Sequence, residues 1–548
     1  MKKHFLFLAG LFILLSFNTL LAQAPPKKIV VENSDMVDIQ QTEVPGAVVY
    51  RGNVRLIHDG VRMACNVAYL FNKENYVKAF GDVKMNQGDT VFMDSKYAEY
   101  RGNTKFAFAT GNVVMRDPKM TLTTDTINFD RRIQQAYYTT YGTIKDQENT
   151  LKSKSGRYFL NDKKFQFLTA VTITNPKYVI KSNHLDYYSN SGHSYLFGPS
   201  TITSKENFIY TEKGFYDTKK NFAHFVKNSY IKYNNRLIEG DSLYYDRNRE
   251  FASATNNVKV TDSINKGIAR GHYAEVYRNQ DSLVMTKHAV AATLIEKDTL
   301  YVHGKKLMIT GKPENRIIRA FNNVRFYKID MSGKCDSLHS NEKNGLTQLI
   351  GKPVVWNGEN QLTGKIIHLI SNTETEKLDS LKVLTDAFIA SKDTLGKGYN
   401  QVKGVNLYGK FRDNKLYEVD LVKNTEKIYY AYDKGELAAI DKGISSSIHL
   451  ELEDNKITTV TAFKNTESES YPEKDLPENA RKLRGFIWRG DEIIKTKDDI
   501  FPQEEKDLHE KIVKRSQAEK AKENVPMEVR KETLDYDKKN PEKKPKGQ

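Results

Sequence analysis

The feature that most constrains the fold is an aromatic residue that recurs every 29 positions through the first half of the chain. A second column, five positions earlier, holds small or polar residues. The aromatic column comprises Phe71, Tyr100, Phe129, Tyr158, Tyr187, Tyr216 and Tyr245, and the second comprises Asn66, Ser95, Thr124, Ser153, Ser182, Thr211 and Gly240. Aromatic residues make up only 11% of the chain, so two columns in one register indicate a true repeat. Periods of about 20–50 residues are typical of proteins whose units must stack to bury their apolar faces.

A Gly or Asn followed by a second small or polar residue and then an apolar one recurs with looser spacing. The elements are Gly52-Asn53-Val54, Gly81-Asp82-Val83, Gly111-Asn112-Val113, Gly142-Thr143-Ile144, Asn256-Asn257-Val258 and Asn322-Asn323-Val324. Because Gly and Asn tolerate positive φ, we interpret these elements as turns that feed a strand. Between them, apolar and polar residues alternate, which is typical of strands with one buried face. Residues 47–465 are therefore predicted to form an all-β body, with two or three short strands in each repeat.

The two ends of the chain differ from this body. Residues 1–22 combine a basic start, an apolar run and a small final residue, as in a secretory signal peptide, and residues 23–46 form a linker. Prolines break the pattern after residue 465, so residues 466–502 are read as an extension. Residues 503–548 hold 13 Lys/Arg and 11 Asp/Glu with few apolar residues, which predicts a charged tail that is helical or disordered.

The net charge, the cysteines and the motifs limit the classes of function that fit the sequence. The net charge of +16 favours anionic ligands such as lipid phosphates or acidic glycans, and export disfavours nucleic acid as a partner. Cys65 and Cys335 are far apart and are expected to stay unpaired. The sequence has no metalloprotease, nucleophile-elbow or phosphate-loop motif, and its histidines never take metal-ligand spacing. We therefore expect no catalytic residue, no metal site and no cofactor.

Several of these elements together resemble a known family. They are Val49-Tyr50-Arg51-Gly52-Asn53-Val54, Ala79-Phe80-Gly81-Asp82-Val83, Asp94-Ser95-Lys96-Tyr97 and Ala109-Thr110-Gly111-Asn112-Val113. Behind a signal peptide, they are similar to the OstA-like family of the periplasmic lipopolysaccharide-transport bridge protein, most clearly over residues 45–260. The resemblance implies an elongated antiparallel β-taco or jellyroll whose apolar interior shields acyl chains. It also implies a periplasmic location, a part in outer membrane assembly, lipopolysaccharide or a related lipid as cargo, and other OstA-like components as partners through strand-edge pairing.

The candidate lining of such an interior is the apolar residue of each Gly/Asn element: Val54, Val83, Val113, Ile144, Val258 and Val324. Plain core filling between stacked repeats would place the same residues inside. The leading hypothesis is a non-enzymatic, periplasmic lipid-binding protein that takes part in lipopolysaccharide transport. Two alternatives stay open. One is a structural or adhesin-like solenoid with a closed core, and the other is a parallel β-helix enzyme that acts on polysaccharide with clustered carboxylates.

Overall fold

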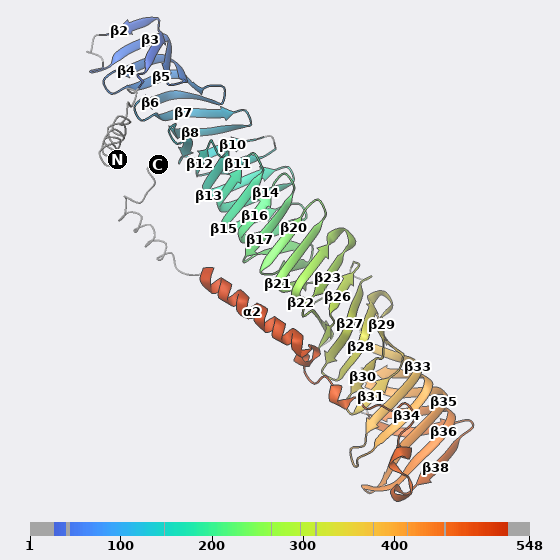
Figure 1. Cartoon of the computed structure of the whole chain (residues 1–548). Coiled ribbons are helices and arrows are strands. Elements are labelled where there is room, and N and C mark those ends of the chain that lie inside the picture. Colours follow the sequence, from blue (N-terminus) through green and yellow to red (C-terminus); the bar gives the residue numbers. More distant parts are fainter. Residues whose placement is uncertain are drawn as a thin grey trace, which may run out of the picture. The chain divides into compact units, whose positions relative to one another are not determined.

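The computed structural model of the chain describes residues 27–39, 44–146, 148–264, 266–295, 298–312, 315–375, 377–413, 415–453 and 456–523 (Figure 1). The signal peptide expected at residues 1–22 and the tail beyond residue 523 lie outside the described residues. The chain forms two compact units that divide between Gly192 and His193, and each unit is considered by itself. Among the described residues, no helix has the length and apolar content needed to cross a bilayer.

The first unit is built from antiparallel strands. Each of the long strands β3 to β8 pairs with the next one along the chain. The strands are β1 (Val30–Asn33), β2 (Met36–Asp38), β3 (Val48–His58), β4 (Val61–Phe71), β5 (Tyr76–Gln87), β6 (Val91–Arg101), β7 (Phe106–Asp117), β8 (Met120–Asp130), β9 (Gln135–Tyr138), β10 (Gly142–Lys145), β11 (Thr150–Ser153), β12 (Ser155–Phe159), β13 (Lys164–Asn175) and β14 (Tyr178–Tyr188).

The two halves of each long strand belong to two separate ladders. One half of β8 pairs with β10 and the other half with β9. Likewise, β13 pairs with both β11 and β12. Each of β3, β5 and β7 has an irregularity near its middle. Ladder A consists of the strand halves that follow this irregularity, the halves of β4, β6 and β8 that pair with them, and strands β10 and β11. Ladder B contains the halves that precede it, with β9 and β12.

A two-residue bulge joins the two ladders within a strand. On β3, Gly52 and Asn53 both have positive φ, at 74° and 45°. They lie between the cross-strand pairs Arg51↔Val67 and Val54↔Cys65. These two residues of β3 therefore lie opposite one residue of β4, Asn66. The positive φ inferred from Gly and Asn is confirmed, but the strand continues through the element instead of starting after it. Such a bulge bends a strand without ending it.

The second unit repeats this division into two ladders. Its strands are β15 (His193–Thr203), β16 (Asn207–Asp217), β17 (Phe222–Lys227), β18 (Tyr230–Tyr233), β19 (Arg236–Glu239), β20 (Ser242–Asp246), β21 (Phe251–Asp262), β22 (Gly267–Tyr277), β23 (Ser282–Thr286), β24 (Val290–Ile295), β25 (Asp298–His303), β26 (Lys306–Thr310), β27 (Ile317–Lys328), β28 (Met331–Asn341), β29 (Leu346–Ile350), β30 (Val354–Asn357), β31 (Asn360–Thr363), β32 (Ile366–Ser371), β33 (Leu378–Lys392), β34 (Tyr399–Arg412), β35 (Lys415–Asp433), β36 (Glu436–Glu453), β37 (Lys456–Phe463) and β38 (Glu467–Tyr471). Its ladder A includes β18, β19, β24, β25, β30 and β31, and its ladder B includes β17, β20, β23, β26, β29 and β32.

The helices of the second unit are short except for the last. They are the 3-10 helices η2 (Arg278–Gln280), η3 (Glu342–Asn344), η4 (Glu473–Asp475), η5 (Glu478–Arg481), η6 (Gly490–Glu492) and η7 (Lys497–Ile500), and the helix α2 (Gln503–Glu523). Figure 1 shows α2 alongside the strands of this unit.

Residues 472–523, which we call the C-terminal strap, run back along the outer face of ladder A and then, at α2, along the bends between the ladders. Leu476 and Leu483 pack against Ile428 and Ile440 of the last strands. Further along, the Gln361 side chain donates to the Ile487 carbonyl at 2.8 Å. Lys334 pairs with Glu492 at 3.2 Å. At α2, His509 Nδ1 lies 2.9 Å from His272 Nε2 on β22. The extension and the start of the tail thus form one packed segment.

The sequence-based fold class is confirmed: the structure is predominantly antiparallel β with a helix in the tail. The long strands of the first unit run to 11 or 12 residues, so the expected short strands are wrong for this part of the body. Cys65 and Cys335 are free, as expected, and both are buried. The 29-residue repeat length and the segment boundaries stay predictions.

Candidate functional site

The six residues proposed to line an interior are all buried, with 0% to 2% of their surface exposed. Val54, Val83 and Val113 directly follow the bulge, where each strand enters ladder A. Val258 and Val324 hold the same place in the second unit. Ile144 differs, because it pairs with Leu151 and Leu122, two positions beyond the bend. All six therefore face inward between the ladders, and their contact with lipid stays a prediction.

The small or polar column marks the bend on the partner strands. Val83 pairs with Ser95, and Val113 pairs with Thr124. The hydroxyls of Ser153, Ser182 and Thr211 each donate to the carbonyl two residues further along, at 2.9 Å. Such a local bond satisfies a backbone group where the regular ladder is interrupted. This column is thus explained by backbone geometry at the bend.

The aromatic column closes the first unit on the side opposite the bends. The Tyr158 hydroxyl on ladder B donates to Asp117 Oδ2 at the end of β7 in ladder A, at 2.7 Å. The Tyr187 hydroxyl donates to Asp146 Oδ2 across the same gap, also at 2.7 Å. The Tyr100 hydroxyl lies 2.8 Å from His58 Nδ1. We call these bonds the clasps, because they join the free ends of two ladders that the bulges already join at the bends.

Further polar and charged pairs reinforce this closure. In the first unit, Lys105 pairs with Asp59 at 2.6 Å between the two sets of hairpins. In the second unit, the Asn207 amide donates to the Tyr245 hydroxyl at 2.6 Å, and Arg316 pairs with Asp262 at 3.2 Å. Burial, with the hydrogen bond to Asp117, raises the pKa of Tyr158, so its hydroxyl stays protonated and keeps donating.

An apolar cavity of about 70 Å³ lies between the ladders of the second unit, near its last strands. Ladder A contributes Val355, Leu362 and Ile389, and ladder B contributes four leucines and one valine: Leu369, Leu381, Leu407, Leu450 and Val419. None of the six sequence candidates is among its lining residues. This cavity could not be predicted from the sequence, because the regular spacing blurs after Tyr245 and the lining residues come from nine separate strands.

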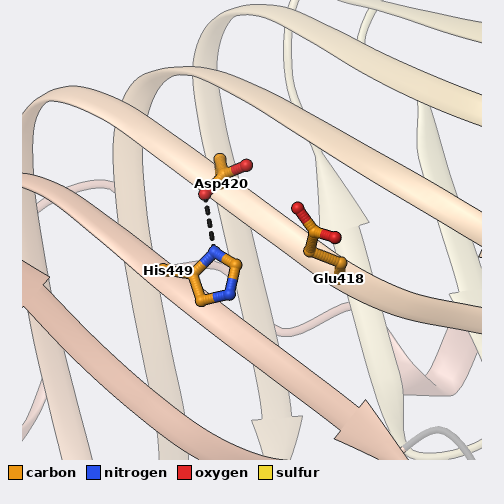
Figure 2. A group of neighbouring side chains, drawn as sticks. All are labelled: Glu418, Asp420 and His449. Atoms are coloured by element: carbon orange, nitrogen blue, oxygen red, sulfur yellow. Dashed lines mark hydrogen bonds and ion pairs between the residues drawn. The ribbon is translucent and has the colours of Figure 1, made fainter.

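One group of side chains on the outer face of β35 and β36 could in principle offer metal ligands (Figure 2). Potential ligand atoms of Glu418, Asp420 and His449 lie within 4.8 Å of one another. However, His449 Nδ1 already contacts Asp420 Oδ1 at 2.7 Å, and Lys410 pairs with Glu418 at 2.8 Å. The group is partly exposed and its members satisfy one another, so a cation would have to displace Lys410. The sequence missed it because Asp420 and His449 are brought together only by strand register.

One protein-family model matches most of the first unit. Residues 26–183 match the family model described as OstA-like protein, which confirms the resemblance over that part of the chain. No curated protein matches the sequence. A solved structure, of LptH, "the LptA homologous periplasmic component of the conserved lipopolysaccharide transport device from Pseudomonas aeruginosa", shares 15% identity. The match covers 26% of this chain and 95% of that chain with a TM-score of 0.21, a level that does not define a common function.

Proposed function

We propose that the protein is a non-enzymatic, periplasmic lipid-binding protein that takes part in lipopolysaccharide transport towards the outer membrane. The observation that supports this most is the match of residues 26–183 to the OstA-like family. The first unit adds two ladders whose facing sides are apolar, with Val54, Val83, Val113 and Ile144 among them.

The physical basis is the transfer of acyl chains out of water. Each CH₂ group that leaves water gains about 0.8 kcal/mol, so a chain enclosed between two apolar sheet faces is strongly held. The inner rows are filled by the protein's own side chains along most of their length. Lipid would therefore enter by parting the ladders at the clasps, where the bonds are polar, or at the cavity of the second unit.

The last strands offer an edge for a partner of similar build. Among the described residues, β37 and β38 pair on one side only, with β36. An unpaired strand edge can accept another strand through main-chain hydrogen bonds. We therefore include other OstA-like components as partners that add at this edge.

A structural role is the second candidate, and one observation favours it. The six interior candidates are packed with 2% or less of their surface exposed, as in a closed core. A solenoid without cargo would look the same at these positions, so the two functions differ only in whether lipid can enter.

Photocrosslinking distinguishes them. Benzoylphenylalanine at Val83 or Val113 probes the interior, and the same probe at Phe108 controls for the outer face of the strand that carries Val113. Cells that carry each variant are irradiated, and crosslinked lipopolysaccharide is detected by immunoblotting. We expect crosslinks from Val83 and Val113 and none from Phe108. No crosslink from the interior, or equal crosslinks from both faces, would remove the lipid-binding role.

A further inference from the structure

The outer face of ladder A in the first unit carries a hollow of about 390 Å³ over strands β3 to β7. Side chains of alternate residues point to this face, because the intervening residues Leu56, Met63 and Met85 are buried on the inner side. The hollow is therefore separate from the interior discussed above. Its walls are charged: Arg55, Arg62, Lys84 and Arg116 are among its lining residues.

Strand register places three of these cations around one small residue. Arg55 on β3 and Lys84 on β5 both pair with Ala64 on β4, so the three residues form one row across the sheet. Neighbouring strands lie about 4.8 Å apart, which puts the Cα atoms of Arg55 and Lys84 roughly 10 Å apart. Arg62 precedes Ala64 by two residues on the same face, at the diagonal distance of about 7–8 Å from each. Because the side chain of Ala64 is only a methyl group, Ala64 forms the floor of the hollow, and the three long cationic side chains surround it.

These three charges are not neutralised by the protein. Arg55, Arg62 and Lys84 are exposed, and none of them forms an ion pair within 4.0 Å with a residue that the structure describes. The fourth cation, Arg116, is already paired with Asp94 at 2.6 Å. Three like charges around one depression repel one another, and an anion with several oxygen atoms would relieve that repulsion. Phosphate fits best, because guanidinium groups bind it through paired, charge-assisted hydrogen bonds.

The remaining wall suggests what the phosphate is attached to. Phe92 is 40% exposed and lines the hollow, where its ring offers an apolar face. The carboxylates of Asp94 and Glu32 also line it and can accept hydrogen bonds from hydroxyl groups. A sugar ring presents both an apolar face and hydroxyl groups, so it matches this side of the hollow.

We propose that the hollow over β3 to β7 is a binding site for a phosphorylated sugar, with the phosphate held by Arg55, Arg62 and Lys84 and the sugar against Phe92. The phosphorylated sugar could be a free metabolite or the headgroup of a lipid, since both present the same chemistry. The site does not depend on the proposed function, because it lies on the opposite face of the sheet from the interior.

Isothermal titration of the full chain at about 0.15 M salt, where exposed charges more than about 8 Å apart are screened, tests the site with glucose 1-phosphate, inorganic phosphate and glucose as probes. The test variant is Arg55→Gln/Arg62→Gln/Lys84→Gln. The matched control, Lys73→Gln/Lys145→Gln/Lys152→Gln, removes the same charge from exposed lysines elsewhere in the first unit. We expect glucose 1-phosphate to bind and the test variant to weaken it at least about 100-fold, since each charge-assisted bond is worth about tenfold or more. The control should stay within about twofold, because screened surface charges contribute little at a distance.

Further arms identify the ligand. Phe92→Ala should weaken glucose 1-phosphate but leave inorganic phosphate unchanged. Sedimentation with phosphatidylethanolamine vesicles, with and without a lipid that carries a phosphorylated disaccharide, tests the headgroup as the source. Binding lost in the test variant and kept in the control supports the site in either arm. No binding of any phosphorylated probe, or an equal loss in both variants, would overturn it. Failure of interior crosslinking would leave this result untouched.

Discussion

Acidification should loosen the C-terminal strap, and the buried histidines under it give the size of the effect. His303 on β25 is fully buried, its Nδ1 bonds the Ala289 carbonyl at 2.8 Å, and its ring packs against Phe501 of the strap at 5.0 Å. Burial lowers its pKa to about 4, and nearby Arg325 acts in the same direction. Glu505 faces its Nε2 at 3.7 Å. When the strap leaves, this imidazole regains water and its pKa returns towards 6.5.

The sign follows from proton uptake. Between pH 6.5 and 4, the undocked His303 binds a proton that the docked one does not, so docking weakens as the pH falls. At pH 5, a shift from 6.5 to about 4 amounts to roughly 2 kcal/mol. Burial also lowers the pKa of His272 to about 4 and that of His288 to about 3, which adds in the same direction. Glu505 opposes them, because burial raises its pKa and docking then gains stability at lower pH.

Hydrogen exchange of the amides in α2 measures this local opening. The roughly 2 kcal/mol from His303 corresponds to protection factors about 30-fold lower at pH 5 than at pH 7.5. His303→Gln removes the titrating group and should abolish that share of the change. His449→Gln, on the outer face of strands β35 and β36, serves as the control and should keep it. Equal protection at both pH values, or an unchanged response in His303→Gln, would refute the reasoning.

Three further predictions concern the clasps, the cavity and the bends. Tyr158→Phe removes the hydroxyl bond to Asp117 and should lower the free energy of unfolding by about 1–2 kcal/mol, measured by urea denaturation of the first unit within the full chain. Leu407→Ala should cost about 2–5 kcal/mol and enlarge the apolar cavity, so a lipophilic dye should bind more tightly; unchanged dye binding would contradict the cavity. Gly111→Ala should destabilise more than Gly60→Ala, since both glycines have positive φ but only at Gly111 would the new methyl meet a side chain, at 2.8 Å; thermal unfolding of the two variants decides this.

The sequence predicts the parts of this fold that depend on local chemistry. Alternating residues marked the strands, and Gly52 and Asn53 marked positive φ correctly. They did not distinguish a turn from a bulge, because both need the same backbone conformation. The hydrogen bond that Tyr158 forms at the clasp could not be predicted from the sequence either, since its partner Asp117 lies 41 residues away and belongs to the other ladder.

The strap was missed for a different reason. Only its last part, from residue 503, has the composition of a solvated segment, and the apolar residues before it, such as Leu476 and Leu483, have partners on β35 and β36 that lie far away in sequence. The hollow on the first unit was equally hidden, because Arg55, Arg62 and Lys84 come together only through register. Sequence patterns thus located the strands and the inward residues, while every contact between distant segments required the structure.

Stacked hairpins that touch only their neighbours tend to fray from a free end, one after another. In the second unit, the strap ties the last strands to β22 through Leu483 at one end and His509 at the other. Loss of a terminal hairpin therefore also removes contacts with strands far along the unit, so we expect the hairpins of this unit to unfold cooperatively. After cleavage within the strap, the hairpins should instead unfold one after another from the exposed edge.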